Sequence, residues 1–291
     1  MMRTSILRSQ SRSSLSDMQA PGVVEQLSDR VSRIVAPNPG PMTGPGTNTY
    51  LIRGAKTAVL DAGPSIPSHT EAILAATGGN IDWLVCTHTH PDHSPGAAVL
   101  AERTGATMVG RLTADSRHQD QTFQPHWAIG QDEVIRDERF CLRAIETPGH
   151  VDNHVCYLLE EEGMVFAGDH IMNGSTVVIV PPGGSMSHYI RSLKKLLDYP
   201  VQSIAPGHGA LIEDCRSEVQ KLIRHRLMRE QKVVSALSQD PQTLDDLVAS
   251  VYDDVSTSLH EWAKLSLEAH LIKLVEDQRV VTDHQAWWLI A

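Results

Sequence analysis

The chain has 291 residues, of which 41% are apolar and 21% are charged, so we expect most of it to fold around one large core or two smaller ones. Its formal net charge of −10 argues against a protein that coats nucleic acid through bulk electrostatics, because phosphate binding requires a dense surface of Lys and Arg. A local basic patch is still compatible with this charge. No stretch approaches the roughly 18 consecutive apolar residues that a membrane-spanning helix requires, so we expect no membrane contact.

The first segment, residues 1–22, is rich in Ser and Arg and lacks the apolar core of a secretory signal. We expect it to be a disordered leader. Its composition is also that of an organelle transit peptide, and a loose extension ahead of a true start near Met18 is an alternative.

Residues 23–213 alternate between strand-like and helix-like runs. The first half predicts strands at 57–63 (TAVLDAG) and 81–87 (IDWLVCT), with a helix at 68–77 between them. The second half predicts strands at 140–146, 154–159 and 164–169, a helix at 189–199 and a strand that begins at 203. This order predicts a layered α/β domain.

The pattern of predicted elements changes at residues 214–291. Three helix-like runs, at 215–239, 243–252 and 259–280, precede a terminal β-ribbon there. Three helices followed by a hairpin are typical of a winged-helix module, so we expect a second, winged-helix-like domain. Its predicted recognition helix carries more acidic than basic residues and is a poor DNA reader. The run at 224–229, which holds Arg224, His225, Arg226 and Arg229, is a better phosphate contact, or else a solvated helix face.

A dense group of histidine and aspartate occupies the segment THTHPDHS: His88, His90, Asp92 and His93. Imidazole and carboxylate are the ligands of catalytic zinc, and no helical or strand period explains the group as packing. Three further candidates follow beside glycines at predicted strand ends: His150, Asp169 and His208. The pattern therefore predicts a metal site, with zinc as the expected ion and iron or manganese as alternatives.

The order of these residues resembles the metallo-β-lactamase superfamily, whose pattern is HxHxDH, then His, Asp and His on an αββα sandwich. The resemblance spans roughly residues 30–212. It implies a first metal held by His88, His90 and His150, a second held by Asp92, His93 and His208, and Asp169 as a bridge between the two. The C-terminal helices are similar to those of the β-lactamase-like protein 2 branch, which implies cleavage of single-stranded RNA.

Three residues are assigned further roles. Asp61, at the end of the strand at 57–63, is expected to orient a ligand histidine, with a turn-forming aspartate as the alternative. Asp92 and His154 are the predicted catalytic residues. His154 lies four residues after His150 and is expected to protonate a leaving group or to bind substrate, and a histidine at a strand edge is the alternative.

Two metal ions that share a water lower its pKa and supply hydroxide at neutral pH. We therefore expect a dinuclear zinc hydrolase that uses a metal-bound hydroxide and cleaves single-stranded RNA. The second hypothesis is an ester or thioester hydrolase of glyoxalase-II-like type that acts on a small acyl substrate. The third is a non-catalytic metal-binding module.

The four cysteines, Cys86, Cys141, Cys156 and Cys215, have no CxxC spacing, so neither a thiolate zinc site nor a disulfide framework is indicated. This pattern favours a reducing compartment, the cytoplasm, or the mitochondrion in a eukaryote. The C-terminal helices and the apolar end WWLI are expected to be able to form the face of a homodimer.

Overall fold

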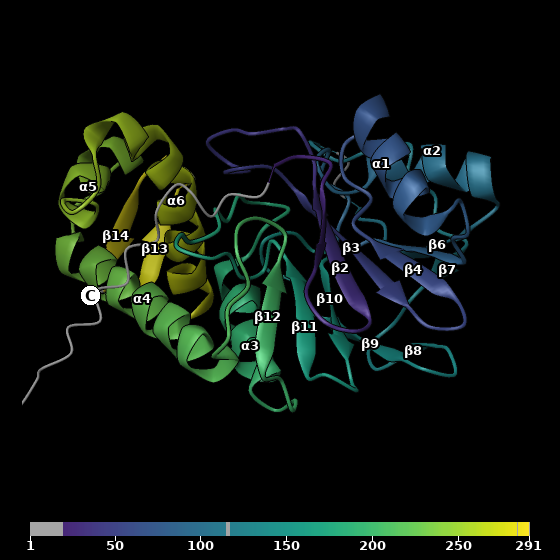
Figure 1. Ribbon diagram of the computed structural model, residues 1–291. Coiled ribbons are helices and arrows are strands. Elements are labelled where there is room, and N and C mark those ends of the chain that lie inside the picture. The colour runs from purple at the N-terminus through teal and green to yellow at the C-terminus, as the bar shows by residue number, and fades with distance from the viewer. Residues whose placement is uncertain (1–19, 115–116, 284, 291) are drawn as a thin grey trace, which may run out of the picture.

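The computed structural model describes residues 20–114, 117–283 and 285–290, so the predicted leader falls almost wholly outside the described residues. Two sheets lie face to face, and helices cover their outer faces (Figure 1). The predicted αββα sandwich is therefore confirmed. Within the described ranges no helix is both long enough and apolar enough to span a membrane.

The first sheet has seven strands in sequence order, antiparallel from β1 to β4 and parallel from β4 to β7. Its strands are β1 (Val24–Gln26), β2 (Val31–Val35), β3 (Asn48–Arg53), β4 (Thr57–Leu60), β5 (Trp83–Val85), β6 (Thr107–Gly110) and β7 (Trp127–Ala128). Side chains alternate between its faces: Tyr50 and Ile52 enter the core between the sheets, whereas Leu51 faces the outer helices.

Helices α1 (Pro67–Thr77) and α2 (Pro95–Thr104) pack on this outer face, where Ile73 and Leu100 are fully buried. Each helix begins with proline in its first turn, where the missing N–H has no intrahelical partner to lose. Helix α2 leads directly out of the histidine-rich loop.

The second sheet has the order β12-β11-β10-β9-β8, and its one parallel pair is β11 with β12. Its strands are β8 (Val134–Arg136), β9 (Cys141–Glu146), β10 (Val155–Leu159), β11 (Met164–Gly168) and β12 (Ser203–Pro206). The core between the sheets includes Tyr50 and Phe166, whose ring centroids are 5.0 Å apart. Helix α3 (Met186–Leu196) covers the outer face through Leu193 and its neighbours, as its helical period predicts.

Helix α4 (Cys215–Ala236) connects the two lobes. Its first half packs with α3 through Val219 and Leu222, whereas Val233 near its end belongs to the C-terminal core. The predicted domain boundary at 213/214 thus falls at the start of a helix that both cores share.

The C-terminal lobe consists of α4, α5 (Leu244–Val251), a 3₁₀ turn (Thr257–Leu259), α6 (His260–Glu276) and the hairpin β13 (Val280–Thr282) and β14 (Trp287–Leu289). Helix α5 begins with a capping box, in which Thr243 and Asp246 satisfy each other's backbone N–H. Trp287, from the apolar end, packs into this lobe's own core. Three helices followed by a hairpin match the predicted winged-helix order.

Candidate functional site

The seven predicted metal ligands converge at one edge of the sandwich, although four different loops supply them. The loop after β5 supplies His88, His90, Asp92 and His93, and the loops after β9, β11 and β12 supply His150, Asp169 and His208. Gly207 allows the loop after β12 to lie close to two of the other loops, because a Cβ at this position would lie 2.7 Å from Asp169 Oδ1 and 2.8 Å from the Cε1 of His93. Residues far apart in sequence therefore present their donor atoms to one another.

The donor atoms form two groups, each within 4.8 Å. The first group holds His88, His90, His150 and Asp169, and the second holds Asp92, His93 and His208. This division agrees with the assignment to two metals that the resemblance implies.

Asp169 lies between the groups. Its Oδ1 is 3.4 Å from His93 Nε2 and 3.3 Å from His208 Nε2, whereas its Oδ2 is 3.8 Å from His150 Nε2. The two carboxylate oxygens therefore face different groups, an arrangement that is compatible with a bridging ligand.

Four of the histidines form a hydrogen bond through Nδ1, so their Nε2 atoms face the cluster. His150 Nδ1 donates to the Val178 carbonyl (2.9 Å) and His208 Nδ1 to the Gly46 carbonyl (3.2 Å). His93 Nδ1 donates to Asp61 Oδ2 at 3.0 Å. His88 Nδ1 contacts the Thr87 hydroxyl at 3.0 Å. Such second hydrogen bonds orient metal-binding imidazoles.

Asp61 lies in the position that its predicted role requires. It is 1% exposed, accepts from His93, and accepts from both the backbone N–H and the hydroxyl of Thr87 at 2.8 Å each. Because Thr87 donates its only hydroxyl proton to Asp61, its oxygen accepts from His88. Asp61 therefore holds histidines of both groups, directly or through Thr87, a residue that the sequence analysis did not single out although it belongs to the THTH motif.

The donor groups fit metal cations. His93 Nε2 and Asp169 Oδ1 are buried and form no hydrogen bond within the described part of the chain. Burial opposes protonation of His208, but Asp169 and Asp92 raise its pKa to about 9, so the carboxylates attract positive charge. In the first group, burial and the neighbouring His150 lower the pKa of His90 to about 3. His90 is therefore neutral and has a lone pair for a metal ion.

The two predicted catalytic residues have different surroundings. Asp92 reaches the surface of the site, where its Oδ2 lies 3.2 Å from His208 Nε2. His154 is 1% exposed, its Nδ1 lies 2.9 Å from the Thr147 hydroxyl, and its ring stacks on His88 with centroids 5.0 Å apart. It does not line the cavity described next, so the structure places it behind a ligand, and its catalytic role stays a prediction.

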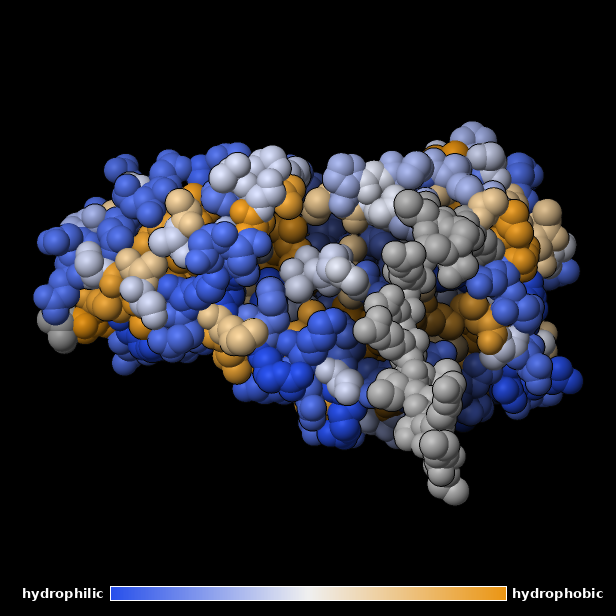
Figure 2. Space-filling view, turned by 60° about the vertical axis from the view of Figure 1, so that its left-hand side comes forward, coloured by the Kyte–Doolittle hydropathy of each residue, from blue (hydrophilic) through white to orange (hydrophobic). Residues whose placement is uncertain are grey.

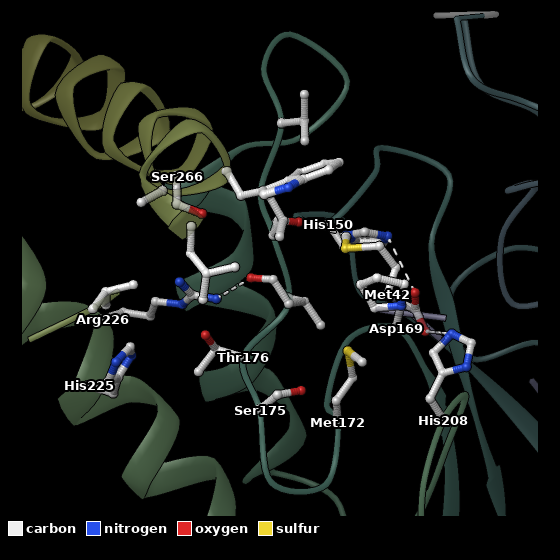
Figure 3. Close-up of a pocket in the computed structure, with 18 of the residues that line it drawn as sticks. Met42, His150, Asp169, Met172, Ser175, Thr176, His208, His225, Arg226 and Ser266 are labelled. Atoms are coloured by element: carbon white, nitrogen blue, oxygen red, sulfur yellow. Dashed lines mark hydrogen bonds and ion pairs between the residues drawn. The ribbon is translucent and has the colours of Figure 1, made fainter. Parts of the chain in front are cut away.

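A cavity of about 480 Å³ extends from the metal ligands to the C-terminal lobe. Figure 3 shows His150, Asp169 and His208 at one end and Arg226 and His225 of α4 at the other. Apolar side chains from both lobes line it between these ends: Met42, Met172, Val180, Val255, Leu259 and Trp262. The surface is hollowed between the lobes in Figure 2, and apolar side chains border the hollow.

The basic run on α4 was interpreted from the sequence as a phosphate contact or a solvated helix face, and the structure agrees fully with neither. Arg226 and Arg229 are only 3% and 7% exposed, so a wholly solvated helix face is wrong for them. Arg229 pairs with both oxygens of Asp254, at 2.7 and 3.0 Å, which weakens the case for a phosphate contact there. Arg224 alone of the three is exposed.

Two profiles of known families match the chain. That of the metallo-beta-lactamase superfamily matches residues 42–208, and that of the beta-lactamase associated winged helix domain matches residues 243–288. Together with the sandwich and its ligand set, these matches show that the chain belongs to the metallo-beta-lactamase superfamily. It is a metal-dependent hydrolase with a C-terminal winged helix domain.

Individual relatives cover most of the chain. A beta-lactamase-like protein 2 homolog of Caenorhabditis elegans is 32% identical over 90% of this chain and 89% of its own length. The atrochrysone carboxyl ACP thioesterase nsrC of Aspergillus novofumigatus is 31% identical over 79% of this chain and 73% of its own.

Solved structures show the same fold. A beta-lactamase domain protein from Burkholderia ambifaria aligns with a TM-score of 0.78 at 17% identity and covers 95% of this chain and 96% of its own. A further protein, solved in a di-iron-bound form, aligns with a TM-score of 0.51 at 25% identity over 62% of this chain and 93% of its own. The family matches and the relatives above confirm the predicted resemblance to the beta-lactamase-like protein 2 branch, with its winged-helix C-terminal domain.

Proposed function

We propose that this protein hydrolyses an ester or thioester of a small, largely apolar acyl group and uses two zinc ions. The cavity carries this proposal, because it joins the metal ligands to a wall of apolar side chains from the C-terminal lobe. Concave, mostly apolar pockets with a few polar groups are typical of small-molecule sites.

His88, His90 and His150 would hold one zinc, Asp92, His93 and His208 the other, and Asp169 both. When bound, the two ions supply a hydroxide nucleophile at neutral pH and polarise the substrate carbonyl. The absence of cysteine from the donor set also suits iron, which leaves the occupant to be measured.

The chain's own residues orient this arrangement. Asp61 and Thr87 fix the imidazole rings from behind, where solvent does not reach them. Met42 and Met172 lie beside the ligands in Figure 3 and cover the approach with apolar surface. The exclusion of bulk water around a reacting carbonyl strengthens its interaction with nearby charges.

The lining of the cavity favours an acyl substrate over a nucleic acid. An RNA strand brings a charge at every phosphate and requires free cations along its path. Among the described residues that line this cavity the only arginines are Arg226 and Arg229, none is a lysine, and Arg229 already pairs with Asp254. Similarity to a protein named as an ACP thioesterase adds support for thioester chemistry.

Cleavage of single-stranded RNA is the second candidate. The similarity to beta-lactamase-like protein 2 homologs, which extends across the C-terminal lobe, favours it. The exposed Arg224 on α4 forms no ion pair with any described residue, so its charge suits a phosphate contact.

The test compares both substrate classes on one zinc-loaded preparation. Acetyl, octanoyl and benzoyl thioesters of N-acetylcysteamine are assayed beside a fluorescent single-stranded RNA, each with and without chelator. We expect chelator-sensitive turnover of the octanoyl and benzoyl thioesters and its loss in an Asp169→Asn variant. RNA cleavage without thioester turnover would overturn the proposal in favour of the second candidate.

A further inference from the structure

The end of the cavity farthest from the metal ligands is polar, which the proposed hydrolysis does not explain. We call it the distal pocket and define it by Thr176, His225, Arg226, Tyr252 and Ser266. In Figure 3 the labelled members of this set gather around Arg226, on the side opposite His208. The pocket is formed where α4 and α6 face the segment after β11.

Arg226 is a buried cation without an anionic partner. It is 3% exposed, one of its terminal nitrogens donates to Val177, and its guanidinium lies 5.2 Å from the centre of the Tyr189 ring. Within the described part of the chain no carboxylate forms an ion pair with it. Glu230, one turn later on the same helix, instead pairs with Lys273 at 3.0 Å.

Arg229, one turn from Arg226 on the same helix, is a buried arginine that does have an anionic partner. Its guanidinium holds Asp254 with two hydrogen bonds and stacks on the Tyr252 ring at 4.2 Å. An unpaired charge inside a protein is unfavourable by several kcal/mol unless a partner of opposite sign is supplied. The contrast indicates that the partner of Arg226 comes from outside the described residues.

Further donors surround the same space. Arg226 Nε, His225 Nδ1 and Tyr252 Oη are buried and have no hydrogen-bond partner among the described residues. Unpartnered buried polar atoms are rare, and here three of them belong to neighbouring residues that line one pocket. An oxygen with negative charge would satisfy such a set.

We propose that the distal pocket binds a carboxylate at the far end of the acyl group whose carbonyl lies at the metal ligands. This inference rests on the proposed function and narrows its substrate to acyl groups with an apolar middle and an anionic end. A carboxylate fits better than an RNA phosphate, because the cavity between Arg226 and the metal ligands is apolar and would exclude a charged backbone.

The experiment measures binding without turnover. Zinc-loaded protein is titrated calorimetrically with adipate, suberate and sebacate, and with the monocarboxylates of equal length. We expect one of the dicarboxylates to bind about 10- to 100-fold more tightly than its monocarboxylate, the range for a hydrogen-bonded charge. Arg226→Met should abolish this preference and Tyr252→Phe should reduce it several-fold. Arg224→Met, the same change at an exposed position of the helix, should leave it unchanged.

Equal binding of both acid series by the wild-type protein, or a preference that persists in Arg226→Met, would overturn the inference. So would a short single-stranded RNA that binds through Arg226 where the dicarboxylates do not. If Arg226→Met does not fold, Arg226→Lys and Tyr252→Phe decide, since a binding role requires that Lys retain part of the preference.

Thioester turnover separates this inference from the proposed function. Turnover without any preference for a terminal carboxylate refutes the distal pocket alone. A dicarboxylate preference without turnover of any thioester supports the pocket and refutes the proposed reaction.

Discussion

Replacement of Asp61 by asparagine tests how the buried hydrogen bonds control metal binding. Asp61 has a φ of 50°, in the left-handed region that Asn tolerates well, so the change preserves both shape and backbone. It replaces one acceptor oxygen with an NH₂ group. Oδ1 can still accept from the Thr87 N–H, but a donor now faces the Nδ1–H of His93 and the Thr87 hydroxyl.

The size of the effect follows from the burial of these groups. A buried donor without an acceptor destabilises by about 1–3 kcal/mol, and loss of a partner behind a metal ligand weakens metal affinity by about 10- to 100-fold. The two ranges agree, because each factor of ten corresponds to about 1.4 kcal/mol. We therefore expect zinc to bind Asp61→Asn about 10- to 100-fold more weakly than the wild-type protein.

A zinc titration against a competing chelator measures this change, and kcat/KM at limiting zinc should fall with it. Asp137→Asn is the control, because Asp137 accepts from the backbone N–H groups of Arg139 and Lys56 at exposed positions, neither of which is a candidate metal ligand. Zinc affinity of Asp61→Asn within twofold of wild type would refute the reasoning, as would an equal loss in Asp137→Asn.

Three further predictions concern other parts of the molecule. Gly207→Ala places a methyl group against Asp169 and His93, so we expect loss of metal from the second group, which metal analysis would detect, and unaltered zinc content would contradict it. Trp262→Ala, at a half-exposed position of the cavity wall, should raise KM for an octanoyl thioester about three- to tenfold and leave that for acetyl unchanged. Burial lowers the pKa of His270 to about 4, so the folded state disfavours its protonation. The contribution of neutral His270 to the free energy of unfolding is complete above the unfolded-state pKa of about 6.5. This contribution falls by about 2 kcal/mol between about pH 7.5 and pH 5. His270→Leu should lose that much less stability over this range in denaturant titrations, and equal pH slopes would exclude the effect.

The fold was predictable because its strands and helices carry strong local patterns. The strands of the core alternate or are wholly apolar, and β5 runs directly into the histidine-rich loop. The candidate ligands stood out because four of them lie within six residues and the others follow glycines at strand ends. Three helices and a ribbon likewise indicated the C-terminal domain, which the family match confirms.

The cavity could not be predicted, since it depends on contacts between segments that are distant in sequence. Arg226 was interpreted as part of a phosphate contact or of a solvated face, because its sequence neighbours are basic. Helix α4 lies between two cores, which buries residues on more than one side, and no single period in the sequence reveals this. The surroundings of His154 were hidden for the same reason, because the His88 ring on which it stacks belongs to the distant loop after β5.

The central claim is that seven side chains hold two metal ions in two adjacent groups. A crystal structure of zinc-loaded protein, with anomalous data collected on both sides of the zinc edge, tests it most directly. The account predicts two zinc peaks, one among His88, His90 and His150 and one among Asp92, His93 and His208, with Asp169 contacting both. A single peak, or metal bound without Asp169, would contradict it.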